Sequence, residues 1–125
     1  MDCNELLNME PFSLLEFLTN NYVYEVDTIA ETSEDMQVVA SIMANTYNEY
    51  SFLSQLLSLA KVQCRLLKRK GKDYKKEYED TIDKRDIIDN ILKVVKLRYQ
   101  TLSRLITIKQ EVNKELSMSE IHSKL

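Results

Sequence analysis

The stretch from Tyr78 to Leu116 constrains the fold most, because it contains neither Gly nor Pro, the residues that most readily interrupt a helix. Its apolar residues recur at alternating steps of four and three, at Ile88, Leu92, Val95, Tyr99, Leu102 and Ile106. A second apolar row lies beside the first and contains Ile91, Val94, Leu105, Ile108 and Val112. This spacing predicts one long helix over residues 78–116, with an apolar face wider than the seam of a two-stranded coil.

A second long helix is predicted over residues 34–69. Thr32 and Ser33 offer capping hydroxyls, and Glu34 and Asp35 would face the positive end of the helix dipole. The apolar positions then alternate steps of three and four, at Met36, Val39, Met43, Thr46, Tyr50, Leu53, Leu57, Ala60, Cys64 and Leu67. This repeat is typical of a coiled coil.

A short basic link, residues 70–76, separates the two predicted helices and contains Gly71, the only glycine of the chain. Glycine after a run of Lys and Arg is typical of a helix C-terminus, where it adopts the left-handed cap and the cations face the negative dipole end. Because the link is short, we expect the two helices to pack antiparallel as a helical hairpin. Residues 117–125 are expected to form a polar tail.

Residues 1–31 are interpreted as an N-terminal arm with one or two short helices. Pro11 suits the first turn of a helix that ends near Asn20 and Asn21. The run from Tyr22 to Val26 has a strand-like composition, but Val23, Val26, Ile29 and Ala30 keep a helical spacing, which favours helix. We expect the arm to close the domain's own core; the alternative is that it docks on a basic neighbour.

Composition indicates a single all-α domain, because 125 residues with one Gly and one Pro leave few turns for a sheet. Polar residues interrupt every apolar run, so no membrane span is expected, and the absence of Lys and Arg before Lys61 argues against a secretory signal. Cys3 and Cys64 are too few for a disulfide framework and suit a reducing compartment. We therefore expect a cytoplasmic protein.

Charge is distributed unevenly along the chain. Residues 1–60 carry ten acids and no base, a net of -10, whereas residues 61–125 carry 17 bases and ten acids, a net of +7. Such asymmetry indicates either head-to-tail assembly or a surface for a polyanion.

Cations concentrated near the link are expected to attract a phosphate backbone, and tyrosines beside them can stack on unpaired bases. A second basic set shares one face of the long C-terminal helix. The predicted nucleic-acid-binding residues are Lys61, Arg65, Lys68, Arg69, Lys70, Lys72, Tyr74, Lys75, Lys93, Lys96 and Arg104. The alternatives are a solvated tip that complements the helix dipole and contact with the acidic half of a neighbouring subunit. The predicted homo-oligomer interface comprises Leu53, Leu57, Ile88, Leu92, Val95, Tyr99, Leu102 and Ile106.

Catalytic motifs are lacking in the sequence. The single histidine, His122, lies in the polar tail, and there is no phosphate loop, metal-ligand spacing or serine elbow. The acids between Glu77 and Asp89 suit a helix start better than a metal site. We expect no enzyme, no cofactor and no metal.

The segments Glu77–Asp80, Asp83–Asp86 and Leu102–Ile108 resemble, in layout, small helical proteins of tailed phages, in particular the UvsY-type recombination mediators. The resemblance covers residues 45–116. It implies an oligomer in a bacterial cytoplasm that binds single-stranded DNA and helps to load a RecA-like recombinase. It also implies that Lys61, Arg65, Lys68, Arg69, Lys72 and Tyr74 contact the DNA.

Two other functions remain open from the sequence. One is a protein-interaction module, such as a small viral inhibitor or scaffold, that uses the coiled-coil face. The other is a helical oligomer that sequesters small anionic nucleotides, for which Arg98, Tyr99 and Arg104 are candidates.

Overall fold

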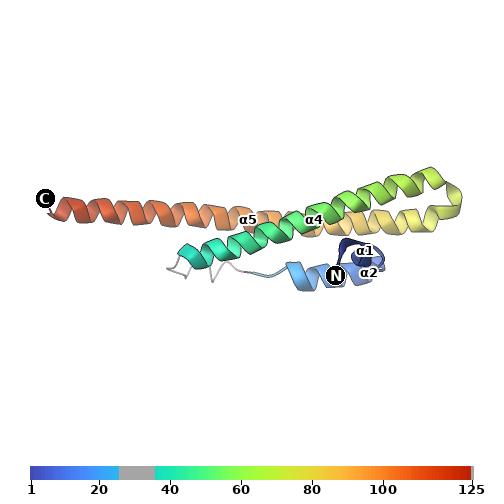
Figure 1. The fold of residues 1–125 in the computed structure, drawn as a ribbon, viewed down its shortest axis with the longest axis horizontal. Helices are drawn as coiled ribbons and strands as arrows, with labels where there is room; N and C mark the ends of the chain where they lie inside the picture. The colour runs from blue at the N-terminus through green and yellow to red at the C-terminus, as the bar shows by residue number, and fades with distance from the viewer. Residues whose placement is uncertain (26–35, 125) are drawn as a thin grey trace. The chain divides into compact units, whose positions relative to one another are not determined.

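The computed structural model describes residues 1–25 and 36–124, and the side chains of all of these except residues 117 and 119–124. The elements are α1 (Cys3–Leu7), α2 (Pro11–Tyr22), α4 (Met36–Lys70), the 3-10 turn η1 (Lys72–Tyr74) and α5 (Lys75–Lys124) (Figure 1). No strand occurs within these described ranges, so the prediction of an all-α helical hairpin is confirmed. The chain divides into two compact units, Met1–Tyr24 with Asn48–Lys96, and Glu25–Tyr47 with Leu97–Leu125.

The first unit begins with two short helices whose starts are set by local chemistry. Asp2 caps α1, because its Oδ1 accepts a hydrogen bond from the Glu5 N–H at 2.8 Å. Pro11 occupies the first turn of α2, as predicted, where a missing N–H costs nothing. Both helices turn leucines inward, and Leu6, Leu14 and Leu18 are fully buried.

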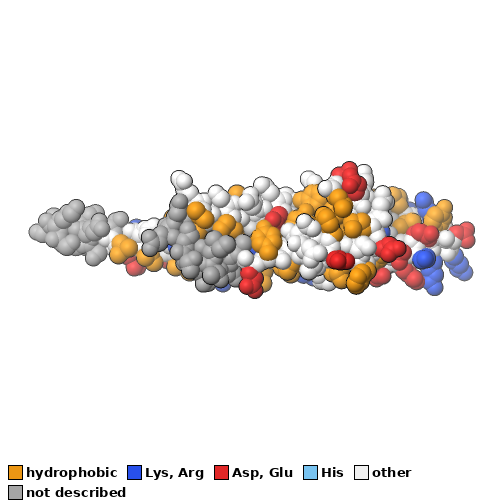
Figure 2. Space-filling model, turned by 90° about the horizontal axis from the view of Figure 1, so that it is seen from below, with side chains coloured by type: hydrophobic (Ala, Val, Ile, Leu, Met, Phe, Trp, Pro, Cys, Tyr) orange, Lys and Arg blue, Asp and Glu red, His pale blue; other side chains and the backbone are white. Residues whose placement is uncertain are grey.

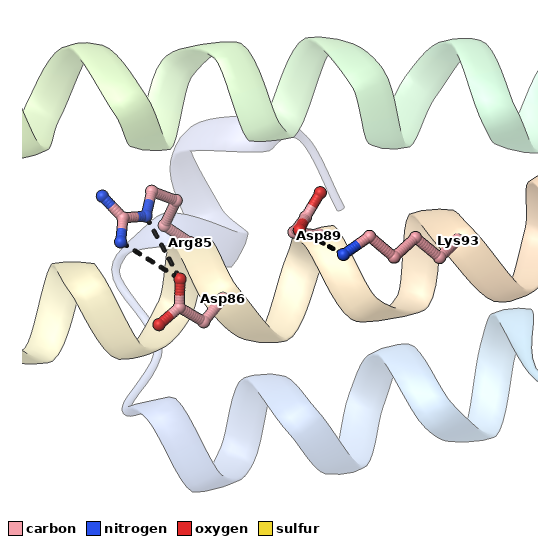
Figure 3. Close-up of polar contacts among 4 residues, drawn as sticks. All are labelled: Arg85, Asp86, Asp89 and Lys93. Carbon is pink, nitrogen blue, oxygen red and sulfur yellow. Dashed lines mark hydrogen bonds and ion pairs between the residues drawn. The ribbon is translucent and has the colours of Figure 1, made fainter.

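The core of the first unit joins these leucines to the hairpin. It contains Leu6, Leu7, Leu14, Leu18, Leu53, Leu56, Leu57, Ala60, Ile88, Ile91 and Val95. In this unit α5 lies between α4 on one side and α2 on the other (Figures 1 and 3). The acidic N-terminal segment therefore closes the chain's own core, which is the first of the two arrangements expected for it.

Three polar and aromatic contacts also attach the N-terminal helices to the hairpin. The Lys84 ammonium donates a hydrogen bond of 2.8 Å to the carbonyl oxygen of Leu7, at the end of α1. The rings of Tyr22 and Phe52 stack with centroids 6.3 Å apart. The hydroxyl of Tyr24 donates to the carboxylate of Glu49 on α4. These contacts satisfy a helix end and fix the direction in which the chain leaves α2.

The chain after Tyr22 differs from the predicted helix over the run from Tyr22 to Val26. Tyr22 is the last residue of α2, and Val23 is extended, with φ -101° and ψ 97°. The predicted continuation of the helix is therefore wrong for Val23–Glu25, where the chain leaves α2 and places Tyr24 against α4. Val26, Ile29 and Ala30 lie outside the described residues, as does the predicted helix start at Thr32, Ser33, Glu34 and Asp35.

The link forms at Gly71, as the sequence predicts, but the predicted left-handed cap is wrong, because Gly71 has a positive φ with an extended ψ. Gly71 has φ 87° and ψ -160°, and the Tyr74 N–H donates to its carbonyl oxygen at 3.2 Å. The next helix begins at Lys75 and continues to Lys124, beyond the predicted end at Leu116. No Gly or Pro follows Gly71, so no backbone signal stops the helix, and it includes most of the expected tail.

The second unit has a smaller core, in which Val39 of α4 and Leu102 of α5 are fully buried. Ile42, Met43, Leu105 and Ile106 pack around them. The rings of Tyr47 and Tyr99 lie beside this core with centroids 5.8 Å apart. A buried hydrogen bond of 3.3 Å from Arg98 Nε to Thr46 Oγ1 joins the two helices.

All ten residues of the predicted α4 heptad row, from Met36 to Leu67, are buried or half-buried. The same holds for the predicted α5 row from Ile88 to Ile106. Of the residues expected at an interface between copies, Leu53, Leu57, Ile88, Val95 and Leu102 lie in the chain's own cores, and Leu92, Tyr99 and Ile106 are half-buried beside them. The facing helix of the hairpin therefore covers much of this surface within one chain.

Candidate functional site

A groove of about 610 Å³ lies between α4 and α5 in the first unit. Its lining comprises Ser58, Lys61, Val62, Cys64, Arg65 and Lys68 from α4, and Tyr78 and Arg85 from α5. Four of these eight residues are cationic and none is acidic. We call this surface the basic groove, and it contains three of the predicted nucleic-acid-binding residues, Lys61, Arg65 and Lys68.

The helical repeat brings the α4 cations together. Lys61, Arg65 and Lys68 are spaced by four and three residues, so they share one side of the helix, next to the buried Cys64. All three are exposed, and no ion pair to any of them is found within the described ranges. They therefore present uncompensated positive charge to the groove.

Arg85 lines the basic groove and also pairs with an acid. Its Nε and Nη2 donate to Asp86 Oδ1 at 3.2 Å each (Figure 3). Arg85 could have been identified from the register of the hairpin. Lys61 precedes the link at Gly71 by nearly the same number of residues as Arg85 follows its end at Tyr74. Antiparallel packing of the two helices therefore places Lys61 and Arg85 at the same height along the hairpin. Asp86 offsets part of the Arg85 charge and holds the guanidinium in place.

Cys64 forms a neutral part of the groove lining. Burial raises the pKa of its thiol, the Arg85 charge opposes this effect and lowers the pKa, and the Asp86 charge raises it again. The net direction is upward, so the thiol stays protonated at neutral pH and is not a thiolate nucleophile. The groove therefore offers charge and apolar contact to an anion, with no activated nucleophile at this position.

The other predicted residues near the link do not line the groove. Arg69, Lys70, Lys72, Tyr74 and Lys75 are exposed around the hairpin end. The Lys70 ammonium lies 4.9 Å from the centroid of the Tyr74 ring, a cation–π contact, and Lys75 pairs with Glu79 at 4.0 Å. Acidic and basic side chains are accordingly mixed at the hairpin end in Figure 2.

The predicted basic stripe on α5 does not form one site. Lys93 pairs with Asp89 at 3.1 Å, so an acid one turn earlier offsets the charge of Lys93 (Figure 3). Lys96 is exposed in the first unit, and Arg104 belongs to the second. Arg104 lines a separate hollow with Tyr99, Gln100, Ser103, Thr107 and Ile108.

The arginine proposed for nucleotide sequestration is a core residue. Arg98 is only 7% exposed, and its Nε donates to Thr46 as described above. Tyr99 is half-buried against Tyr47, and only Arg104 of the three candidates is exposed. The three residues therefore do not present a common surface to a nucleotide.

No group of three or more His, Cys, Asp or Glu side chains with metal-binding geometry occurs in the part of the chain that the structure describes. The side chain of His122 lies outside that part. No described helix combines the length and apolar character needed to cross a membrane.

Comparison with known proteins leaves the basic groove as the main guide to function. No protein-family model, no curated protein and no solved structure matches this chain.

Proposed function

We propose that this protein binds single-stranded nucleic acid in the basic groove and is not an enzyme. The observation that carries the proposal is the convergence of Lys61, Arg65, Lys68 and Arg85, from two helices, on one groove whose lining contains no acid. Although the chain carries a net negative charge, this groove concentrates positive charge along a surface on which a phosphate backbone can lie.

Binding would be driven by electrostatics and stacking. The Lys and Arg side chains displace counterions from phosphates, and this contribution is independent of sequence. Tyr78 lines the groove and Tyr74 is 41% exposed nearby, so both offer rings to unpaired bases. A single strand exposes its bases to such rings, whereas a duplex keeps them stacked, and this favours single-stranded substrates.

The resemblance to UvsY-type mediators extends this proposal. It adds DNA as the nucleic acid, a RecA-like recombinase as a protein partner, and a phage-infected bacterial cytoplasm as the setting. Of the contact residues that this resemblance implies, Lys61, Arg65 and Lys68 line the groove, whereas Arg69, Lys72 and Tyr74 lie outside its lining.

The test compares two charge reversals that change the net charge equally. Lys68→Glu alters the basic groove, and Lys114→Glu alters an exposed lysine of the second unit. We expect Lys68→Glu to weaken binding of a fluorescently labelled oligo-dT about tenfold in an anisotropy titration, because a lost phosphate contact becomes a repulsion. Lys114→Glu should change the affinity about twofold or less. Equal losses in both variants would mean that net charge alone governs binding, and would refute the groove.

A protein-interaction module is the second candidate. It is favoured by apolar side chains of α5 that remain exposed in the second unit, Leu97, Ile108, Val112 and Leu116. On this alternative, a protein partner binds tightly, oligonucleotides do not bind, and charge reversal at Lys68, Arg69 and Lys72 leaves function intact.

A further inference from the structure

A second groove in the first unit combines exposed apolar and acidic side chains. Its lining comprises Pro11, Phe12 and Leu15 of α2, and Asp83, Asp86, Ile87 and Asn90 of α5, and it holds about 400 Å³. Phe12 is 75% exposed and Leu15 is 41% exposed. Figure 2 looks onto the side of the first unit where α2 lies, and hydrophobic and acidic side chains alternate there. We call this surface the acidic groove.

Phe12 is exposed to water, so its ring contributes little hydrophobic burial free energy to the fold of a single chain. A phenylalanine ring contributes stability by burial, and large aromatic residues are enriched at the centres of protein interfaces. The flanking carboxylates make a nucleic acid an unsuitable occupant, since they repel phosphates. The occupant must instead offer apolar contact together with positive charge.

The outer face of α4 has this chemistry. Leu59, Val62 and Leu66 are spaced by three and four residues and are 42%, 39% and 49% exposed, on the side of α4 away from the buried Ala60 and Cys64. Arg65 and Arg69 follow the same side of the helix and are exposed. A shallow hollow lined by Ser54, Gln55, Ser58 and Leu59 adjoins this row, with room for an inserted side chain. We call this surface the basic apolar face.

We propose that the acidic groove of one copy binds the basic apolar face of a second copy. Phe12 would enter the hollow beside Leu59, while Asp83 faces Arg65 or Arg69. Asp86 contributes less charge, because it already binds Arg85. Charge complementarity selects a second copy, because Asp83 forms no ion pair among the described residues, and neither do Arg65 and Arg69.

The contact joins two different surfaces. In a pair of copies, one copy therefore keeps an unused basic apolar face and the other keeps an unused acidic groove. Such a heterologous contact continues into a ring or an open filament, whereas a contact between identical surfaces stops at a dimer. This difference makes the proposal testable by mixing two damaged chains.

The experiment uses Phe12→Asp, which disables the acidic groove, and Leu66→Asp, which disables the basic apolar face. Both positions are exposed, so both variants should keep the helical circular dichroism of the wild type. In sedimentation velocity at low salt, the wild type should form species larger than a dimer, and each variant alone should be monomeric. An equimolar mixture should give a heterodimer and nothing larger, because only one intact pair of surfaces remains. Leu116→Asp, at an exposed leucine of the second unit, is the matched control and should assemble like the wild type.

Several results would overturn the proposal. A wild type that remains monomeric at about 100 μM, an affinity too weak for a specific assembly, is one of them. Assembly that survives Phe12→Asp, or that is lost in Leu116→Asp, would place the contact elsewhere. A mixture of the two damaged chains that stays monomeric would show that the two surfaces do not bind one another. Asp83→Lys provides a second check on the acidic groove, and it should weaken assembly at least tenfold if Asp83 faces an arginine.

Discussion

At the scale of single residues, the buried pair Thr46–Arg98 shows how a polar contact is placed inside the second unit. Thr46 is fully buried, donates a hydrogen bond to the Ile42 carbonyl at 2.9 Å and accepts one from Arg98 at 3.3 Å. The heptad pattern predicted that Thr46 points inward, and this is confirmed. Its partner was not predicted, because periodicity identifies a face without stating which side chain lies opposite.

Replacing Thr46 with Val tests this pair. The β-branched shape is retained, but Arg98 loses an acceptor in a buried site, so we expect the free energy of unfolding to fall by about 1–2 kcal/mol. Urea denaturation followed by circular dichroism measures the change. Thr107→Val is the matched control, because Thr107 also donates to a carbonyl one turn back, that of Ser103, but is exposed. Its expected change is within about 0.5 kcal/mol. Equal losses in the two variants would contradict a specific role for the Arg98 contact.

Cys64 gives the protein a predictable response to alkaline pH. Burial raises the pKa of its thiol above the ordinary value of 9.0. Between the unfolded and the folded pKa the native state holds more protons than the unfolded state, so stability falls as the pH rises. We expect the free energy of unfolding to decline more steeply between pH 8.5 and about 10 in the wild type than in Cys64→Ala. Urea denaturation at stepped pH measures both slopes, and parallel slopes would contradict the assignment.

At the scale of elements, the two long helices were predictable because their signals are local and repetitive. The heptad row of α4 and the four-three row of α5 identify the buried faces, and Gly71 identifies the link. The N-terminal helices were harder, since short amphipathic segments do not reveal which surface they cover. The basic groove was predictable in part: Lys61, Arg65 and Lys68 follow from spacing on one helix, whereas Arg85 depends on the hairpin register.

Gly71 sets the geometry of the link through its backbone. With φ 87° and ψ -160° it occupies a region almost restricted to glycine, and an added Cβ would meet no atom within 4 Å. The cost of Gly71→Ala is therefore backbone strain alone, and we expect a loss of about 1–3 kcal/mol in the free energy of unfolding. Lys72→Ala, at the next and exposed position, should change it by less than about 0.5 kcal/mol in the same urea titration. A neutral Gly71→Ala would mean that the link takes another conformation.

Adjacent leucines in α2 test whether the N-terminal helices belong to the core. Leu14 is fully buried against the hairpin, and Leu15 is 41% exposed. Leu14→Ala should lower the free energy of unfolding by about 2–5 kcal/mol, because it removes transfer energy and leaves a cavity. Leu15→Ala should cost about 1 kcal/mol or less. Thermal or urea unfolding measures the free energy of unfolding of both variants. Similar losses for Leu14→Ala and Leu15→Ala would show that α2 does not pack as described.

At the scale of the whole molecule, the first unit presents two grooves of opposite charge. The N-terminal helices pack on the hairpin, and α2 together with Asp83 and Asp86 of α5 forms the acidic groove, which contains the exposed Phe12. The basic segment around the link forms the basic groove and the outer face of α4. Sequence asymmetry indicated either polyanion binding or head-to-tail assembly, and the two proposals assign these roles to overlapping surfaces of α4 that share Ser58, Val62 and Arg65.

The central claim is that the basic groove holds a phosphate backbone, and salt dependence tests it most directly. The affinity for oligo-dT is measured by anisotropy at salt concentrations between about 50 and 200 mM. Each phosphate contact on a single strand contributes about -0.7 to the slope of log affinity against log salt, so four groove cations predict a slope of about -2 to -3. Lys68→Glu should make the slope shallower by about one contact. An affinity that stays flat across this range, or the absence of any binding at the lowest salt, would contradict the account.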